Sequence, residues 1–380
     1  MKAIAFYLPQ FHPIPENNAW WGEGFTEWHH VSRARPLFPG HQQPKLPGRL
    51  GFYDLRLEQT RLDQAELARS HGIDAFCYWH YWFGTNDTLL DLPLQSVLKS
   101  KKPDFPFCLA WGNHSWWDKS RGRLLKKQTY GGTDDYKAHF YHVLPCFQDS
   151  RYLKKDGKPV FLLFDYQDIP DIDVFVSTWK ELAVTEGLLG VFFIFQTQDW
   201  KTASLHGCDG FIQPEDFKIP FDEKSLVKRT LKKWNLFRPV KQVLQKSGLL
   251  DMYRRNMGLL GVNRMEYSEA MKRVLQRDAP DTMFPCVYPG WDSTPRHGKN
   301  GLVLHNATPG RFYEHCLETL HWIRQRHVTD DLMFIKSWNE WAEGNYMEPD
   351  QLYGTGLLQA FLRARRDSGV DCSLEDAASA

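Results

Sequence analysis

Short runs of consecutive apolar residues recur along the chain, and a stretch with helical periodicity usually follows each of them. These runs are apolar throughout instead of alternating with polar residues, which is the pattern of strands buried on both faces of a sheet. The runs span residues 3–7, 73–82, 107–112, 160–166, 191–196, 210–213, 284–288 and 333–338. Helical patterns span residues 56–71, 134–149, 173–187 and 308–326.

Repeated units of strand and helix predict a (β/α)8 barrel, or TIM barrel, as the fold class. A doubly wound sheet is the alternative, but the chain lacks a G-x-G-x-x-G turn after its first strand, and Gly22-Glu23-Gly24 does not match one. An α/β barrel is a single domain even in a chain of 380 residues. We therefore predict one catalytic domain over residues 1–366 and a C-terminal tail over residues 367–380.

Two long segments interrupt the regular spacing. Residues 9–53 follow the first strand and are rich in Pro, Gly, His and Trp, and the aromatic content predicts an ordered, functional loop. Residues 218–278 separate strands six and seven, have more than twice as many basic as acidic residues, and contain amphipathic helical patterns. We predict a basic helical insertion there. It forms either a solvated helical surface or a surface for an anionic glycan, a lipid-linked substrate or membrane headgroups.

The composition narrows the class of protein. Lys and Arg number 47 against 46 Asp and Glu, a formal net charge of +1, which argues against a dedicated nucleic-acid binder. The apolar runs are too short for a transmembrane segment, and Met1-Lys2-Ala3 leads into the first strand without a signal peptide, so we expect a cytoplasmic protein. The seven Cys include no C-x-x-C pair and are expected to be free thiols.

Aromatic residues are abundant, with 15 Trp and an aromatic content of 14%. A Trp side chain most often fills a core, but many of these stand in short polar clusters beside Gly, Asn, His, Asp or Glu. A flat apolar ring that loses little conformational entropy is suited to stack on the C–H face of a sugar. The composition therefore favours carbohydrate recognition.

The ends of the predicted strands supply candidate substrate-binding residues, because an α/β barrel builds its active site at the C-terminal ends of its strands. Nearly every strand ends in hydrogen-bonding side chains beside an aromatic ring, the mixture that sugar hydroxyls and a sugar ring face require. The loop after strand one adds further candidates. The set is Tyr7, Gln10, His12, Trp21, Glu27, Trp28, Trp79, His80, Tyr81, Trp82, Trp111, Asn113, His114, Asp165, Gln196, Gln213, Glu215, Tyr288, Trp291, Asn339, Trp341 and Tyr346.

No metal site and no cofactor are predicted. The histidines have no H-x-x-x-H or comparable spacing joined to a carboxylate motif, and for His12 and His80 hydrogen bonding to sugar hydroxyls is the better interpretation. The D-x-D sequence Asp171-Ile172-Asp173 is shared with metal-dependent glycosyltransferases, but it begins a helical pattern, where Asp is expected in any case.

Two carboxylates three residues apart, Glu340 and Glu343, follow the last predicted strand. In a continuing strand they would face opposite ways, but a turn that begins near Glu340 and is helped by Gly344 can bring both into one pocket. Glycosyl transfer needs such a pair, since one carboxyl protonates the departing oxygen while its partner acts as nucleophile or base. Solvation on a loop is the alternative, and the flanking Trp338 and Trp341 favour the catalytic interpretation.

Three segments resemble the WbsX family of polysaccharide gene clusters, which is classed as glycoside hydrolase 99-like. They are YLPQFHP at 7–13, WGEGFTEW at 21–28 and WNEWAEGNYMEP at 338–349, and the resemblance extends from Lys2 to about Ala360. It implies a (β/α)8 barrel related to endo-α-mannosidases and endo-mannanases that acts with retention of configuration and without metal.

The resemblance also implies roles for the two glutamates. Glu340 would be the base that acts on the substrate's own 2-hydroxyl to give a 1,2-anhydro sugar, and Glu343 would be the general acid/base. The related hydrolases have His where this chain has Ala342, so the surroundings of the acid differ. The family has been labelled glycosyltransferase as well.

The predicted function is a retaining glycoside hydrolase-type enzyme that cleaves an α-linked manno- or rhamno-configured oligo- or polysaccharide. Attack by O2 requires it to lie trans to the leaving group, which favours these two configurations. One alternative is a glycosyltransferase in bacterial surface-polysaccharide (O-antigen) biosynthesis that uses the same pocket. The other is a carbohydrate-binding barrel without catalysis.

Overall fold

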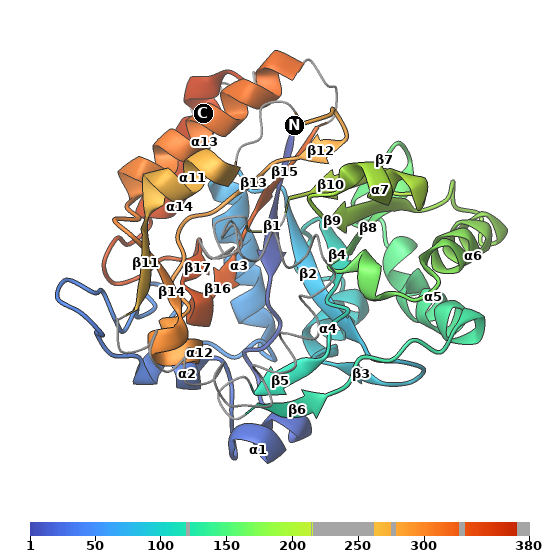
Figure 1. The fold of residues 1–380 in the computed structure, drawn as a ribbon, viewed down its shortest axis with the longest axis horizontal. Helices are drawn as coiled ribbons and strands as arrows, with labels where there is room; N and C mark the ends of the chain where they lie inside the picture. The colour runs from blue at the N-terminus through green and yellow to red at the C-terminus, as the bar shows by residue number, and fades with distance from the viewer. Residues whose placement is uncertain (119–121, 214, 216–261, 275–278, 327–330, 371–380) are drawn as a thin grey trace, which may run out of the picture.

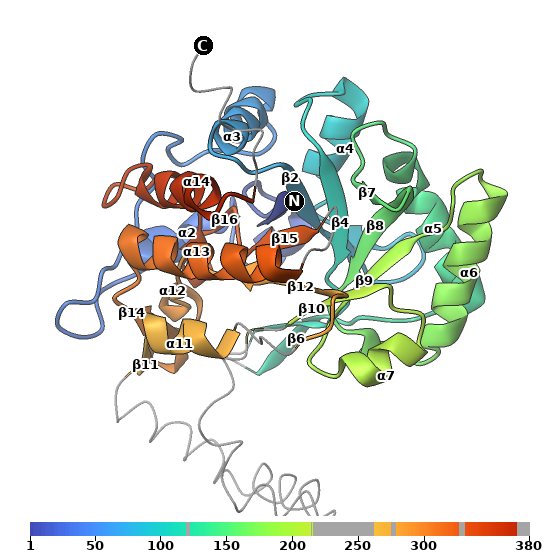
Figure 2. The ribbon, with the colours of Figure 1, turned by 90° about the horizontal axis from the view of Figure 1, so that it is seen from above.

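A ring of parallel strands surrounds the centre of the molecule, and helices cover the outside (Figures 1 and 2). The computed structural model describes residues 1–118, 122–213, 215, 262–274, 279–326 and 331–370. The barrel strands are β1 (Lys2–Tyr7), β2 (Ala75–Trp82), β4 (Phe107–Trp111), β8 (Lys158–Leu163), β9 (Phe192–Gln196), β10 (Gly210–Ile212), β12 (Met283–Phe284), β13 (Cys286–Val287) and β15 (Leu332–Ile335). All eight predicted runs contain barrel strands.

Pro285 divides one strand of the ring into two short pieces. β12 pairs in parallel with β10, and β13 pairs in parallel with β15. Because proline has no N–H, it cannot donate to the ladder, but its carbonyl accepts a hydrogen bond from the Phe334 N–H at 2.8 Å. β12 and β13 together therefore fill one of eight positions, and pairing of β15 with β1 completes the (β/α)8 barrel that the sequence predicts.

Helices pack against the outside of the ring, as the apolar strands require. The four predicted helical segments are confirmed as α3, α5, α6 and α13, with bounds that differ by one or two residues at most ends. The outer helices are α3 (Glu58–Ser70), α4 (Leu92–Ser100), α5 (Thr133–Phe147), α6 (Ile172–Thr185), α7 (Trp200–Leu205), α11 (Tyr267–Val274), α13 (Pro309–Arg326) and α14 (Gly356–Ser368).

The connections after the strands hold short elements of their own. The predicted aromatic loop contains α1 (Pro15–Trp21) and α2 (Trp28–Arg33). The other short elements are β3 (Thr88–Leu89), β5 (Trp116–Asp118), β6 (Arg123–Lys126), β7 (Lys154–Lys155), β11 (Asn263–Glu266), β14 (Leu302–His305), β16 (Asn339–Glu340), β17 (Asn345–Tyr346), α12 (Thr294–His297), and the 3-10 turns η1 (Tyr166–Asp168), η4 (Gly298–Asn300) and η5 (Trp341–Glu343). Of the predicted basic insertion, the structure describes only residues 262–274, and residues 371–380 of the predicted tail also lie outside the described residues.

Side chains alternate between the barrel interior and the helix layer along each strand. On β2, Trp79 stacks on Phe6 with ring centroids 5.1 Å apart, whereas Trp82 stacks on His139 of α5 at 4.8 Å. The six cysteines in the described ranges are free thiols, as the sequence predicts. Within these ranges, every helix is too short or too polar to cross a bilayer.

Candidate active site

One arginine binds three carboxylates beyond the C-terminal end of β15. Its Nη2 lies 2.7 Å from Glu340 Oε1 and 3.0 Å from Glu27 Oε2, and its Nη1 lies 2.9 Å from Glu343 Oε1. The arginine is Arg296 of α12. Glu27 precedes α2, Glu340 ends β16 and Glu343 ends η5. We call these four residues the carboxylate cluster. It brings together three segments that are distant in the sequence.

A tight turn places both late glutamates on the same side. β16 and β17 form an antiparallel hairpin, and the 3-10 turn η5 between them puts Glu340 and Glu343 within reach of one guanidinium. Gly344 then adopts a left-handed conformation with φ of 63°, and a Cβ there would lie 2.8 Å from the backbone N of Asp292. Only glycine combines this backbone conformation with such a close approach.

Asp292 fixes the start of the helix that carries Arg296. Its Oδ1 accepts hydrogen bonds from the N–H and the hydroxyl of Thr294, and its Oδ2 accepts from Gln43 Nε2 at 2.6 Å. His41 donates from Nε2 to the same oxygen at 2.8 Å, since its Nδ1 accepts from the Leu37 N–H. Burial opposes the charge of Asp292, but His41 and its other donors lower the net pKa of this carboxyl.

The carboxylate cluster holds more acid than one arginine can neutralise. Burial raises the pKa of Glu340 most, Arg296 lowers it, and the charges of Glu343 and Glu27 raise it again, to about 8. A carboxyl with this pKa carries a proton at neutral pH. The cluster therefore places a proton donor beside two further carboxyl groups and a guanidinium.

A second ion pair lies inside the barrel. Lys336, which follows β15, pairs with Glu215, and its Nζ lies 5.5 Å from the ring centroids of Phe6 and Trp79. Both members of the pair are buried. The sequence predicted Glu215 from the end of strand six, but it assigned no role to Lys336.

A buried carboxylate supports the turn from behind. Glu348 accepts hydrogen bonds from Trp341 Nε1 at 2.6 Å, Gln64 Nε2 at 2.6 Å and the Tyr53 hydroxyl at 2.9 Å. Burial raises the pKa of Glu348 to about 7 in spite of these donors. The Trp341 ring also stacks on Tyr346 at 3.8 Å. Trp341 is therefore held on its edge and on one face, and it fixes η5 between the two glutamates.

We expect Glu348→Gln to lower the free energy of unfolding by about 1–3 kcal/mol, because the amide turns an N–H₂ group toward donors that the carboxylate accepts. Urea denaturation at pH 7 measures the change. Glu181→Gln, which changes an exposed glutamate of α6, is the matched control and is expected to have no effect. Equal stability of the two variants would contradict the role of Glu348 in holding the turn.

Other predicted residues lie near the cluster or inside the barrel. Glu27 binds Arg296, the Trp28 ring lies 5.6 Å from the Trp341 ring, and burial together with the nearby Glu340 charge raises the pKa of Tyr81. Trp79 lies over the barrel interior beside Lys336.

Several predicted residues point into the helix layer instead. The Tyr7 hydroxyl donates to Gln64 of α3 at 2.7 Å. His80 Nε2 lies 2.9 Å from His139 Nε2 of α5, and Trp82 and Trp111 pack on the same His139 ring. The structure does not bring these four side chains to the carboxylate cluster.

Two predicted asparagines bridge backbone segments at the strand ends, and a predicted aspartate caps a turn. The side-chain amide of Asn113 accepts a hydrogen bond from the backbone N–H of Asp165 and donates one to its carbonyl. The side-chain amide of Asn339 makes the same two hydrogen bonds with the backbone of Leu8. Asp165 itself accepts from the Gln167 N–H at the start of η1. At the other strand ends, Gln10 and Gln196 are half-buried, His114 is exposed, and His12, Gln213, Tyr288 and Trp291 are buried.

Two cavities adjoin segments of the carboxylate cluster. One, of about 350 Å³, is lined in part by Gly344 and Tyr346. The other, of about 410 Å³, is lined by Trp21, Phe25 and Pro295 among others, and it combines aromatic rings with arginine and histidine side chains. The predicted residue Trp21 therefore faces a cavity that reaches the helix of Arg296.

Sequence reasoning missed Arg296, the residue that joins the cluster. It lies in Thr294-Pro295-Arg296-His297, away from any predicted strand end. Nothing local marks it, because its three carboxylate partners come from positions 27, 340 and 343. The one available signal is the charge balance, since three acids at one site, two of them buried, require a cation.

Comparison with known proteins relates nearly the whole chain to one family. The model of the family described as Glycosyltransferase WbsX matches residues 3–361. The WxcX proteins of two strains of Xanthomonas campestris pv. campestris are 34% and 33% identical to this chain over 366 residues. Each alignment covers 95% of this chain and 49% of the relative. The chain thus spans about half the length of the curated relatives it matches.

Solved structures of similar fold include a glycoside hydrolase and a glycoside hydrolase-like protein. The endo-alpha-mannosidase of glycoside hydrolase family 99 from Bacteroides thetaiotaomicron, in complex with bis-tris-propane, aligns with a TM-score of 0.56 and 14% identity, over 100% of this chain and 99% of that one. A glycoside hydrolase-like protein aligns with a TM-score of 0.56 and 12% identity, over 96% and 93% of the two chains. At this identity the likeness establishes the barrel fold alone.

Proposed function

Because this chain belongs to the WbsX family, we propose that it is a glycan-processing enzyme of the glycoside hydrolase type with its active site at the carboxylate cluster. The observation that carries the proposal is the binding of Glu340 and Glu343 to one guanidinium, at 2.7 and 2.9 Å. Cleavage of a glycosidic bond needs a proton donor and an anionic partner in one pocket.

In the proposed mechanism one glutamate is the general base and the other is the general acid. The resemblance to the hydrolases assigns Glu340 to the base that acts on the 2-hydroxyl and Glu343 to the acid that protonates the departing oxygen. In the free protein the proton lies on Glu340, whose pKa is about 8. This assignment therefore requires the proton to be on Glu343 when the bond breaks, and Arg296, which contacts both, stabilises whichever carboxylate is charged.

The proposed substrate is an α-linked manno- or rhamno-configured glycan. Its O2 must lie trans to the leaving group for a 1,2-anhydro sugar to form, and these configurations provide that arrangement. The aromatic rings of Trp21 and Phe25 in the 410 Å³ cavity offer flat faces for a further sugar unit.

The test is turnover of a panel of α-linked manno- and rhamno-oligosaccharides by the purified protein, followed by NMR of the anomeric product. We expect hydrolysis with retention that is lost in the double variant Glu340→Gln/Glu343→Gln. The description of the family model as a glycosyltransferase supports transfer as the second candidate. Turnover only with an activated sugar donor would replace hydrolysis by transfer at the same cluster, and glycan binding without any turnover would refute both.

The pH dependence of kcat/KM is expected to follow the shared proton. Catalysis needs one proton on the pair, so activity is expected to fall about tenfold per pH unit above pH 8, where Glu340 loses its proton and both carboxyls are charged. Initial rates between pH 6 and 10 measure this, with circular dichroism at each pH to confirm the fold. A rate that stays constant to pH 10 would contradict the shared-proton mechanism.

A further inference from the structure

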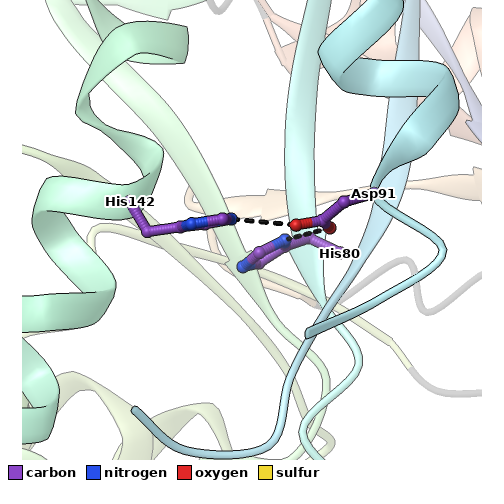
Figure 3. A group of neighbouring side chains, drawn as sticks. All are labelled: His80, Asp91 and His142. Carbon is purple, nitrogen blue, oxygen red and sulfur yellow. Dashed lines mark hydrogen bonds and ion pairs between the residues drawn. The ribbon is translucent and has the colours of Figure 1, made fainter. Parts of the chain in front are cut away.

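Two histidines and an aspartate meet on the outside of the barrel, away from the carboxylate cluster. Figure 3 shows His80 from β2, Asp91 from the start of α4 and His142 from α5, all directed to one point. His142 Nε2 lies 3.0 Å from Asp91 Oδ2, and His80 Nδ1 lies 3.7 Å from Asp91 Oδ1. One ligand atom from each residue falls within 4.8 Å of the other two.

His80 is the buried member of this group. Its side chain is 1% exposed, and its Nδ1 has no hydrogen-bond partner. The other ring nitrogen, Nε2, lies 2.9 Å from His139 Nε2. When Nε2 donates its proton to His139, Nδ1 carries a free lone pair that points toward Asp91. A buried nitrogen in this state lacks a partner that a cation would supply.

We propose that His80, Asp91 and His142 form a binding site for a divalent transition-metal cation, with Zn²⁺ as the ligand that fits best. Two imidazole nitrogens and a carboxylate oxygen are a donor set that Zn²⁺ accepts, with water in the fourth position. In the metal-free protein the hydrogen bond from His142 to Asp91 and the 3.7 Å contact between His80 and Asp91 keep the three ligands together. The cation would take the place of the proton between His142 and Asp91.

The surroundings of the site suit a metal. His139 contacts the ring nitrogen of His80 that faces away from the cation, which is how outer residues orient a metal-bound histidine. Ligand atoms around zinc lie closer together than 4.8 Å, so binding requires a small approach of His142. Its side chain is 28% exposed, and its ring stacks on His80 at 5.6 Å and lies 5.2 Å from the Trp82 ring, so the required approach is a small shift of the ring along these neighbours.

The proposed cation joins three elements. It would connect β2 to α4 and α5, and β2 also carries Trp79 and Tyr81 on its other face. The expected role is stabilisation of this side of the barrel, so the proposal is independent of the proposed glycosidase activity. It departs from the sequence prediction of no metal, because positions 80, 91 and 142 have no motif spacing.

The experiment is a titration of the chelator-treated full chain with Zn²⁺ alone, followed by calorimetry and thermal unfolding, and with Co²⁺ alone, followed by visible absorption. We expect one Zn²⁺ per chain, a rise in Tm on binding, and the absorption bands of four-coordinate Co²⁺. His142→Ala and Asp91→Asn are expected to bind at least tenfold more weakly. The matched control is His206→Ala, which removes a surface histidine paired with Asp173 at 2.8 Å and is expected to bind as the wild type does.

The proposal is overturned if the wild-type chain takes up no stoichiometric metal, or if both variants bind as tightly as the control. Circular dichroism of each metal-free variant establishes that it is folded. Should His142→Ala fail to fold, His142→Gln replaces it, because glutamine keeps the hydrogen bond to Asp91 and removes the imidazole ligand. Equal metal affinity in His142→Gln and the wild type would likewise overturn the site.

Discussion

Glu340→Gln is expected to lower kcat on a glycan substrate by about 100- to 10,000-fold, the range that a general acid or base contributes. The amide keeps the volume of the side chain, and its oxygen can still accept from Arg296, so the fold and substrate binding are retained. It can neither give nor take a proton at the working pH. Steady-state kinetics on the best substrate of the oligosaccharide panel measure the loss, and KM is expected to change by only a few fold.

Glu343→Gln is expected to lower kcat by a similar factor. The double variant is expected to lose little more activity than either single variant, because the two carboxyls act as a unit. Glu23→Gln, an exposed glutamate of the same aromatic loop as Glu27, is the control and should leave kcat unchanged. A Glu340→Gln enzyme with more than a tenth of the wild-type kcat would remove Glu340 from the chemistry.

The fold was predictable because burial leaves a direct trace in the sequence. Strands that are covered by helices on one face and by the barrel core on the other must be apolar at every position. The runs at 3–7 and 333–338 are of this kind, and they contain β1 and β15, which pair to close the ring. The division of one strand at Pro285 was not predicted, since the apolar run begins one residue before it and continues after it.

The candidate site was predictable only in part, because a strand end does not indicate which face a side chain takes. Along β2 the side chains alternate, so Trp79 enters the barrel while His80 and Trp82 enter the helix layer. All three residues lie near the end of the strand, so this criterion selects each of them equally as a site residue. Alternation alone puts Trp79 opposite His80 and Trp82, but both faces of this strand are buried, so the sequence does not say which face lines the barrel.

The sequence did not predict residues that come together only in the folded structure. Glu340 and Glu343 stand in one short motif, and Glu27 lies in an aromatic loop whose length marks it as functional. Arg296 has neither signal. It belongs to a helix of four residues whose start is set by Asp292, and its role follows from charge compensation once the carboxylates are in place.

Arg296→Met is expected to lower the free energy of unfolding by about 2 kcal/mol at pH 7, because it leaves the carboxyl groups of Glu27, Glu340 and Glu343 without the cation that binds them. The loss is expected to grow as the pH rises. Arg296 lowers the pKa of Glu340, so its removal raises that pKa further above the unfolded value. A carboxyl with a raised folded pKa contributes stability that is complete below its unfolded pKa and is lost as the pH rises through the folded one.

Urea denaturation of Arg296→Met at pH 5 and pH 8 tests this argument, and the deficit relative to the wild type should be smaller at pH 5, where the carboxyls hold more protons. Arg33→Met, which removes an exposed arginine of α2 beside the 410 Å³ cavity, is the control and should show a small deficit at both values. Arg296→Lys should recover part of the stability, since one ammonium keeps the charge but cannot bond three carboxylates as the planar guanidinium does. An equal deficit at both pH values would mean that Arg296 stabilises the fold by packing and not by charge. In that case the charges of the cluster would not set the pKa of Glu340.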